Sequence, residues 1–353
     1  MNAVTFFDGE EWRDGVIDCV DGRPALRDER PSPELPRLDG VITGGFTDHH
    51  VHLQLVDHAL LAGSPLGRVL DLGANPAVVA QLAVHNSSKA TGPEAPGSTA
   101  GPVSGPGADG FEELCTPPAP HPVQIDFAGA FLTAPGGYPS DREWAPEGSV
   151  REIADADAAA RAVAEMADAG ASCIKVASNG SAGPVFDDDL FRTIVDLAAA
   201  HALDVVAHAE GRGEAQRVVR LGAARLAHAP FTERLDDEEI ADQAASASWI
   251  STLAIHGGAD LTVALHNIRR FHAAGGTVLY GTDMGNGPTP VGLNGTELRA
   301  LRDAGLDDAA LLRALAPVDP RGPGTRLLFL SGTTPETADP LHARPLTPAD
   351  LKV

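Results

Sequence analysis

Cysteine is scarce in this chain of 353 residues. The three cysteines, Cys19, Cys115 and Cys173, form no Cys-x-x-Cys pair and are odd in number, so the sequence indicates neither a disulfide framework nor a cysteine-ligated zinc site. A basic segment followed by an apolar stretch is missing from the start of the sequence, and no apolar run approaches the length that spans a bilayer. We therefore expect a cytoplasmic protein.

Positive charge is also in short supply. Lysine and arginine total 26 against 49 acidic residues, which gives a formal net charge of -23. Nucleic acids and anionic membranes both bind positive surfaces, so neither is expected as a partner. A hydrophobic content of 43% and a charged content of 21% are typical of a globular protein. The expected partner is a small-molecule substrate, and a homo-oligomer is compatible with the sequence.

Short runs rich in valine, isoleucine and leucine alternate with longer alanine-rich stretches of helical periodicity, which is typical of βα units on a parallel sheet. The helices expected between the strands include 151–170, which closes on Gly170, and 259–276, which closes on Gly275 and Gly276. Another is expected at 187–203, where it opens on a cluster of aspartates. Eight strands are expected, at residues 41–49, 68–74, 123–131, 171–178, 204–209, 224–230, 248–254 and 277–283.

This pattern predicts an α/β fold, a (β/α)8 TIM barrel over residues 41–323. Residues 1–40 differ, because their β-prone runs are split by Asp-Gly turns. Together with residues 324–353, which contain TRLLFLSG, they are expected to form a small β-sandwich domain. Residues 86–122 are rich in glycine, proline, serine and alanine, and we expect a flexible insertion there between the second and third βα units.

The stretch FTDHHVH at residues 46–52 crowds three histidines into one strand end. Side chains alternate between the faces of a strand, so Asp48, His50 and His52 point one way while His49 and Val51 point the other. Two imidazoles on one face can bind one metal ion. His49 is expected to face the helices.

Later strands end on further metal-binding side chains. Barrel active sites lie at the C-terminal ends of the strands, so these groups should meet at one mouth. Such nitrogen and oxygen donors suit a pair of divalent ions, with zinc as the default and manganese or iron as alternatives. The candidate ligands are His50, His52, Lys175, His208, His228 and Asp283.

Lys175 is one of three lysines, and it stands inside the apolar strand CIKVAS. Burial lowers the pKa of an ammonium group and leaves a nucleophilic amine. Such an amine can add CO₂ to form a carbamate, which can bridge two metals. A lysine that extends to the surface or pairs with Asp283 or a nearby glutamate is the alternative, and the lysine alone does not decide between them.

The ordered motifs FTDHHVH, CIKVAS, VVAHAEG, RLAHAPFTE and YGTDMG resemble those of the amidohydrolase superfamily, and GASCIKVASNG is most similar to its prolidase-like branch. The resemblance spans most of the chain, from about Gly40 to the helix ELRALRDAG. It implies that His50, His52 and Asp283 hold a buried metal, that His208 and His228 hold an exposed one, and that carboxylated Lys175 bridges them.

In that family the two ions share a bridging hydroxide, and Asp283 would pass a proton to the leaving amine while the exposed ion polarises the carbonyl. The resemblance therefore implies hydrolysis of a C–N bond in a small amide, cyclic amide or dipeptide-like substrate. Two departures stand out. GPGTRLLFLSG replaces the family's usual Gly-Lys-x-Ala-Asp-Leu turn, and Ala227 replaces an acidic residue common before His228.

Loops at the barrel mouth shape specificity, and four of their side chains are candidate substrate contacts that are equally compatible with ordinary turn or mouth residues. They are Tyr138, Arg142, Asn179 and His256.

Three other functions stay open. The same site could cleave an ester or lactone, or the chain could be a catalytically silent barrel that serves as a scaffold. It could also be a mononuclear deaminase, but such enzymes place a glutamate three residues beyond the fifth-strand histidine, where this chain has Gly211. Glu210 falls one residue short, with the opposite facing expected if the strand persists.

Overall fold

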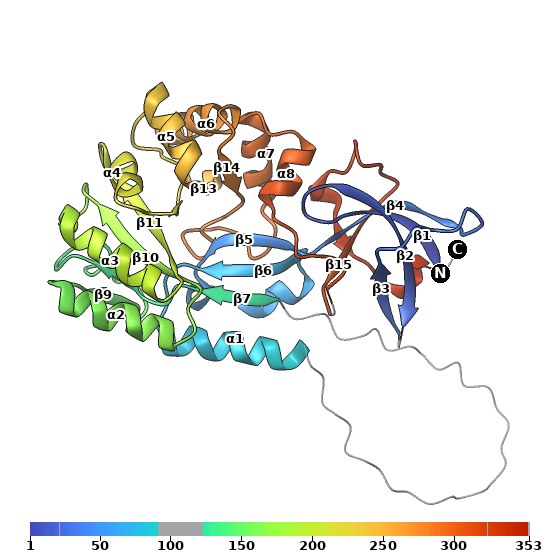
Figure 1. The fold of residues 1–353 in the computed structure, drawn as a ribbon, viewed down its shortest axis with the longest axis horizontal. Coiled ribbons are helices and arrows are strands. Elements are labelled where there is room, and N and C mark those ends of the chain that lie inside the picture. Colours follow the sequence, from blue (N-terminus) through green and yellow to red (C-terminus); the bar gives the residue numbers. More distant parts are fainter. Residues whose placement is uncertain (21, 91–122, 323, 352–353) are drawn as a thin grey trace, which may run out of the picture.

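The computed structural model describes residues 1–20, 22–90, 123–322 and 324–351. Figure 1 shows two parts, a larger part of strands and helices and a smaller β-sheet that holds both ends of the chain. No helix in these residues is long and apolar enough to cross a bilayer.

The larger part is built on parallel strands that are hydrogen-bonded in two sheets, in the orders β5-β6-β7 and β14-β13-β12-β11-β10-β8-β9. The eight expected strands are all present, although several are shorter than expected. The strands are β5 (Phe46–Val51), β6 (Leu66–Asp71), β7 (Gln124–Phe127), β8 (Phe131–Thr133), β9 (Val150–Glu152), β10 (Cys173–Asn179), β11 (Asp204–Glu210), β12 (Arg225–Leu226), β13 (Ser248–Ile250) and β14 (Thr277–Leu279).

The two sheets are joined at both ends of this series. On one side the His49 N–H donates to the Tyr280 carbonyl at 3.0 Å, and Val51 forms a parallel bridge with Met284. On the other side, β8 follows β7 after three residues. Apart from β9, which lies at the free edge of β8, spatial order therefore follows chain order, and the first strand contacts the segment after the last, which is the arrangement of a TIM-barrel-type fold.

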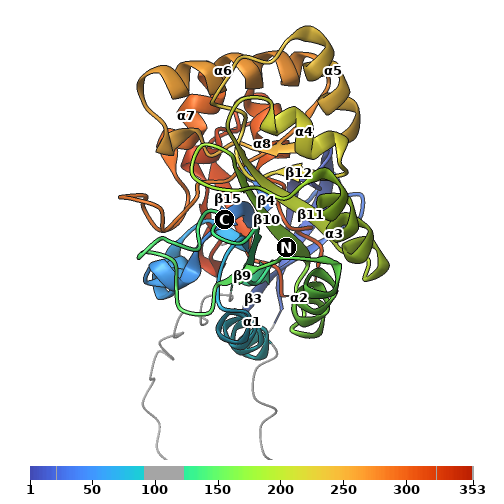
Figure 2. The ribbon, with the colours of Figure 1, turned by 90° about the vertical axis from the view of Figure 1, so that its left-hand side faces the viewer.

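Helices surround these strands, as Figure 2 shows in the view along the larger part. Two of the expected helices begin at aspartates that accept a backbone N–H, Asp155 from Ala158 and Asp187 from Leu190. The helices are α1 (Pro76–Ala90), α2 (Ala156–Asp168), α3 (Asp188–Ala200), α4 (Glu214–Arg220), α5 (Asp237–Ser246), α6 (Gly258–Ala273), α7 (Gly295–Asp303) and α8 (Asp308–Ala314), with short 3-10 helices η1 (Leu53–Leu55), η2 (His58–Gly63), η3 (Leu253–Ile255), η4 (Pro340–His342) and η5 (Pro348–Leu351).

Alternation along β10 and β11 divides their side chains between two buried clusters. Cys173 and Val206 belong to a small cluster that draws on most of the parallel strands. Ile174 and Val205, one residue along, pack in the large cluster with the helices. Because side chains repeat every second residue, Lys175 points to the same side as Cys173, which places its amine inside the ring of strands.

The smaller part is one mixed sheet of six strands with the order β16-β15-β4-β1-β2-β3. Its own apolar cluster includes Phe6, Ile42 and Phe329. The expected joining of the two ends of the chain is therefore present, and the residues described form one sheet here. Its strands are β1 (Asn2–Phe7), β2 (Trp12–Val20), β3 (Arg23–Arg27), β4 (Arg37–Gly44), β15 (Leu327–Ser331) and β16 (Arg344–Pro345).

Three expected boundaries are wrong. The strand expected at 123–131 is divided into β7 and β8, which belong to different sheets. The strand expected at 41–49 is two strands, because β4 ends at Gly44 in the small sheet and β5 begins at Phe46 among the parallel strands. A Cβ at Gly44 would overlap the Val318 carbonyl, so only glycine fits at this change of sheet. The insertion expected at 86–122 begins later, since α1 continues to Ala90, and its residues 91–122 lie outside those described.

Candidate active site

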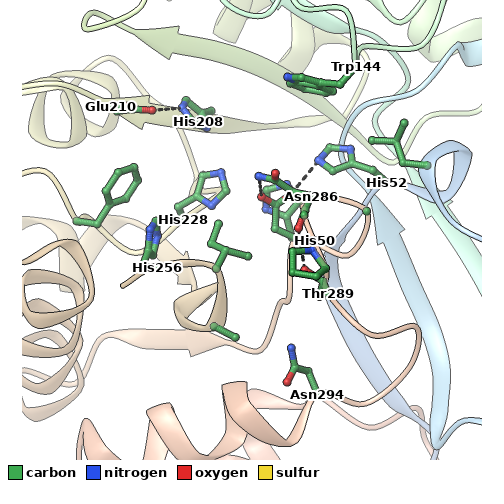
Figure 3. Close-up of a pocket in the computed structure, with 18 of the residues that line it drawn as sticks. His50, His52, Trp144, His208, Glu210, His228, His256, Asn286, Thr289 and Asn294 are labelled. Atoms are coloured by element: carbon green, nitrogen blue, oxygen red, sulfur yellow. Dashed lines mark hydrogen bonds and ion pairs between the residues drawn. The ribbon is translucent and has the colours of Figure 1, made fainter. Parts of the chain in front are cut away.

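A cavity of about 770 Å³ opens at the C-terminal ends of the parallel strands. The six candidate ligands all line it, although they come from five different strands or strand ends. Figure 3 shows His50, His52, His208 and His228 around one open space. The candidate ligands are His50, His52, Lys175, His208, His228 and Asp283.

The two histidines of β5 are fixed by backbone carbonyls. His50 Nδ1 lies 2.8 Å from the Ala227 carbonyl oxygen, and His52 Nδ1 lies 3.2 Å from that of Gly73. A carbonyl oxygen can only accept, so each Nδ1 carries a hydrogen and Nε2 is the ring atom that can bind a metal. This arrangement, in which the other ring nitrogen sets the tautomer, is typical of metal-ligating histidines.

Asp283 lies between these two imidazoles. Its Oδ1 is 3.2 Å from His50 Nε2 and 3.0 Å from His52 Nε2, and its Oδ2 accepts from Asn286 Nδ2 at 2.8 Å. Two donors that each stand about 2.1 Å from one ion are roughly 3 to 3.5 Å apart, so these spacings fit a shared ion. The backbone of Asp283 is left-handed, with φ 52°, which is strain of the kind found at functional sites.

The backbone just after β14 lies close to His50 at Gly281. A Cβ on Gly281 would overlap Ile250 Cγ2 and lie 3.2 Å from His50 Cβ. Beside it, buried Asp48 accepts from the Thr282 hydroxyl at 2.6 Å and from the His50 N–H at 3.0 Å. Asp48 thus ties the end of β5 to the residue before Asp283.

His208 and His228 form the other half of the cluster. The ring centroids of His208 and His228 are 4.8 Å apart, and those of His50 and His228 are also 4.8 Å apart. His228 Nδ1 lies 2.8 Å from Thr252 Oγ1, and His208 Nε2 lies 3.2 Å from Glu210 Oε2. The cluster is therefore continuous from β5 to β12.

Burial sets the protonation of this cluster. It lowers the pKa of His50 and of His228 well below the ordinary value, so both are neutral at pH 7. It also lowers the pKa of Lys175 to about 8. His50, His228 and Asp283 each offer one ligand atom within 4.8 Å of the others. Neutral imidazoles and a carboxylate at this spacing fit a divalent ion such as zinc.

Among known proteins, similarity to this chain is found with solved structures only. No protein-family model matches the sequence, and no curated protein matches it. Among solved structures, the chain is similar to a Xaa-Pro dipeptidase with bound methionine (16% identity, 94% of this chain and 93% of that chain, TM-score 0.63). It is also similar to an A. niger ochratoxinase (17% identity, 97% and 94%, TM-score 0.64) and to phenylurea hydrolase B (15%, 98% and 95%, TM-score 0.65).

The chain has the fold of these hydrolases. Other similar structures are those of an amidohydrolase and a dihydroorotase. The expected resemblance to the amidohydrolase superfamily, prolidase-like structures included, is therefore confirmed at the level of the fold.

Two of the four expected substrate contacts line the cavity, and the other two do not. Tyr138 and His256 line it. Asn179 is buried and donates to Glu210 Oε2 at 2.7 Å, so it reaches the cavity through that carboxylate. Arg142 stands over the Tyr138 ring, with its guanidinium carbon 5.7 Å from the centroid, and pairs with Asp141.

The lining side chains that were not predicted as substrate contacts include Trp144, Phe231 and Glu210. Glu210 has the facing that a persisting strand predicts, because β11 runs through Glu210 and residues two apart share a face, so it faces opposite to position 211 and points to the cavity beside His208. Spacing along the strand could have found Glu210. Trp144 and Phe231 stand on loops, where periodicity carries no signal.

The two departures from the family pattern have visible structural outcomes. Ala227 takes part through its backbone, since its carbonyl oxygen accepts from His50. The stretch GPGTRLLFLSG forms β15, which pairs antiparallel with β4 from Leu327 to Ser331. The small sheet is thus closed without the usual turn.

Proposed function

We propose that this protein is a metal-dependent hydrolase that cleaves a C–N amide-type bond in a small amide, cyclic amide or dipeptide-like molecule. The observation that carries the proposal is that six potential ligands from distant parts of the sequence line one cavity. The solved structures of this fold include enzymes whose names denote hydrolysis of C–N bonds, a dipeptidase and a phenylurea hydrolase.

The ligands are assigned to two ions. His50, His52 and Asp283 hold one, because Asp283 Oδ1 contacts both Nε2 atoms. His208 and His228 hold the other. The compact group of His50, His228 and Asp283 takes members from both sets, so the two positions adjoin each other. Zinc is the preferred ion, with manganese or iron as alternatives.

Lys175 joins the two ions as a carbamate. It is fully buried, and within the described chain no carboxylate lies close enough to form an ion pair with its amine. With its pKa lowered to about 8 by burial, an appreciable share of the amine is neutral at pH 7. The neutral nitrogen adds to CO₂, a proton is released, and the carbamate gains two oxygen donors.

When bound, the two ions would supply an activated water and a Lewis acid for the substrate carbonyl. The protein's own residues then position and transfer protons. Asp283, held at Oδ2 by Asn286, receives a proton and delivers it to the leaving nitrogen. The buried histidines keep their orientation through Ala227, Gly73 and Thr252.

A mononuclear deaminase is the second candidate, and one observation favours it. Glu210 lines the cavity next to His208, so a carboxylate is available to move protons there. In that case Lys175 would have no metal role. Hydrolysis of an ester or lactone at the same site and a catalytically silent scaffold are the remaining alternatives.

Metal analysis of the purified protein separates these functions. Two ions per chain, together with mass evidence for CO₂ on Lys175, are expected for the hydrolase. One ion supports the deaminase, and none after metal loading supports the scaffold. Lys175→Ala and the longer Lys175→Met should both reduce metal content and activity. If both variants kept the metal content and activity of the parent protein, the carbamate assignment would be wrong.

We also propose a division into a barrel of residues 41–323 and a domain of residues 1–40 and 324–353, a place in the cytoplasm, and a small-molecule substrate without nucleic acid or membrane as a partner. A screen over N-acyl amino acids, dipeptides, cyclic amides and lactones would identify the substrate.

A further inference from the structure

Aromatic side chains form one wall of the cavity above the histidines. The chain has only 3 tryptophans and 2 tyrosines, and one of each lines this cavity. The Trp144 ring centroid lies 6.2 Å from that of Phe131 and 6.1 Å from that of Tyr138. Tyr138 in turn lies 5.2 Å from His208, and Trp144 lies 6.5 Å from His52. The wall therefore extends over both halves of the candidate metal site.

Trp144 is exposed, unlike the other tryptophans. Its exposed fraction is 41%, and it is the single aromatic residue among the exposed large hydrophobic side chains of the described chain. Trp249 is buried and stacked on Phe271 at 3.8 Å, and Trp12 packs on Phe7 at 5.2 Å. An indole left open at a cavity mouth is apolar area that a ligand can cover.

A second aromatic surface is formed by Phe231 and His256. Their rings are 4.2 Å apart and tilted by 33°, and His256 lies 6.5 Å from His228. His256 Nε2 is enclosed and has no hydrogen-bond partner in the part of the chain described. Figure 3 shows Trp144 and His256 on different sides of the histidine cluster. A planar ring can pack against either wall, and a polar group beside it can pair with His256.

Apart from the proposed metal ions, the side chains around the cavity offer no cationic partner to a substrate carboxylate. Among the described lining residues, no arginine is present and Lys175 is the one lysine, and a carbamate there would carry a negative charge. Arg142 lies outside the lining, and its guanidinium faces Asp141 at 3.3 Å. Carboxylates are usually recognised by arginine, whose planar fork binds both oxygens.

The lining of the cavity instead includes a carboxylate, that of Glu210. Glu210 lines the cavity, is held by Asn179 at 2.7 Å, and forms no ion pair with an arginine or lysine within the described chain. The whole protein carries a formal charge of -23, so its field also disfavours approach of anions.

We propose that the site selects an amide that carries an aromatic ring and no free carboxylate, and that it discriminates against N-acyl amino acids and dipeptides. This proposal deepens the proposed hydrolase function and rests on it for the reaction, whereas the selectivity of binding can be measured separately. Trp144 supplies the surface for the ring, and Glu210 supplies the repulsion.

The test compares two compounds that differ by one carboxylate, N-acetyl-2-phenylethylamine and N-acetyl-L-phenylalanine. With the metal-loaded protein, kcat/KM is expected to be on the order of 100-fold higher for the neutral compound, since like charges at a binding site cost several kcal/mol. Binding is measured in parallel by quenching of tryptophan fluorescence and by calorimetry. Equal or tighter binding of the carboxylate compound would overturn the proposal.

The two readouts separate the two claims. If neither compound is cleaved but the neutral one binds more tightly, the hydrolase function fails for these amides and the selectivity holds. If both are cleaved at the same rate, the hydrolase function stands and the selectivity is refuted.

Variants identify the groups responsible. Trp144→Ala should weaken binding of the neutral compound roughly 10-fold, Trp144→Phe should keep most of it, and Trp12→Phe in the small sheet should change nothing. Glu210→Gln should reduce the preference for the neutral compound about 10-fold. If the preference is unchanged in Glu210→Gln, and binding is unchanged in Trp144→Ala, the assigned groups are wrong.

Discussion

The hydroxyl of Thr252 holds the imidazole of His228, with Oγ1 2.8 Å from Nδ1 and both side chains buried. The Thr252 backbone is left-handed, with φ 45°, which is rare for a β-branched residue. Its conformation is maintained by Glu297, which accepts the N–H groups of Leu253 and Ala254 at 2.9 and 2.6 Å. The loop after β13 therefore positions a candidate ligand that lies two residues after β12.

Thr252→Val tests this relationship, because valine keeps the shape and the backbone preference of threonine and removes only the hydroxyl. Metal affinity at the proposed site should fall about 10- to 100-fold, the usual cost of losing such a partner of a ligand. Isothermal titration of the metal-free protein with zinc measures it. Thr262→Val on the exposed face of α6 is the matched control and should bind like the parent. Unchanged affinity in Thr252→Val would mean that His228 needs no such partner.

The adjacent residues His49 and His50 face different surroundings, so substituting each in turn tests which of them binds metal. His50 lines the cavity. His49 does not, its enclosed Nε2 has no hydrogen-bond partner in the described chain, and burial lowers its pKa to about 3. His50→Leu should lose metal binding, whereas His49→Leu should keep it.

The free energy of unfolding gives an independent test of the surroundings assigned to His49. His49→Leu removes an unsatisfied polar atom, so its free energy of unfolding should stay equal or rise by about 1 kcal/mol. Denaturant unfolding together with metal analysis of both variants measures this. Loss of metal in His49→Leu with an intact fold would show that the facing assigned to these histidines is reversed.

The candidate ligands could be predicted because they lie at the ends of strands. Alternation places His50 and His52 on one face. The parallel pairing of β10 with β11 brings Lys175 and His208 to the same face of the sheet, since Lys175 pairs with Val206, two residues before His208. Local sequence is enough for both steps once the strands are recognised. The expected meeting of these side chains at one mouth is what the structure has.

The features that escaped prediction depend on contacts between distant segments. The run 41–49 is interrupted by Gly44 and Gly45, which indicate a break, but the sequence does not report that the chain leaves one sheet at Gly44 and enters another at Phe46. Thr252 has an unfavourable backbone conformation that its own sequence would not choose. Glu210 is different in kind, because its two-residue spacing from His208 already places both side chains on the same face of β11.

The buried carboxyl of Glu297 predicts a dependence of stability on pH. Burial raises its pKa from an ordinary 4.5 to about 7 in the folded protein. Between these values the folded state binds the proton and the unfolded state has lost it, so the contribution of Glu297 to the free energy of unfolding falls as pH rises from about 4.5 to 7 and then stays constant. The fall is on the order of 3 kcal/mol.

Glu297→Gln should remove this share of the pH dependence, which urea unfolding at several pH values measures as the difference from the parent protein. Glu238→Gln on the exposed side of α5 is the control and should follow the parent curve. A difference between the parent and Glu297→Gln that does not vary from pH 4.5 to 7 would contradict the raised pKa.

Arg326, just before β15, connects the C-terminal segment to the turn between η2 and β6. Its side chain is 5% exposed, and its guanidinium donates to the carbonyl oxygens of Ser64, Leu66 at 3.0 Å and Ala62 at 3.1 Å. Removing the donor would leave buried acceptors unsatisfied, which costs more than an exposed contact. Arg326→Met, which keeps much of the apolar stem, should therefore lower the free energy of unfolding by about 3 kcal/mol.

The exposed Arg161 on α2 is the control, and Arg161→Met should change stability by less than about 0.5 kcal/mol. Because Arg326 lies outside the cavity lining, metal content of the folded Arg326→Met protein should match the parent. Guanidinium unfolding and metal analysis decide the matter together. A loss of stability no larger than that of the Arg161 control would mean that Arg326 does not tie the small sheet to the β6 strand, and that the apolar cluster of β1, β4 and β15 holds this end of the chain without it.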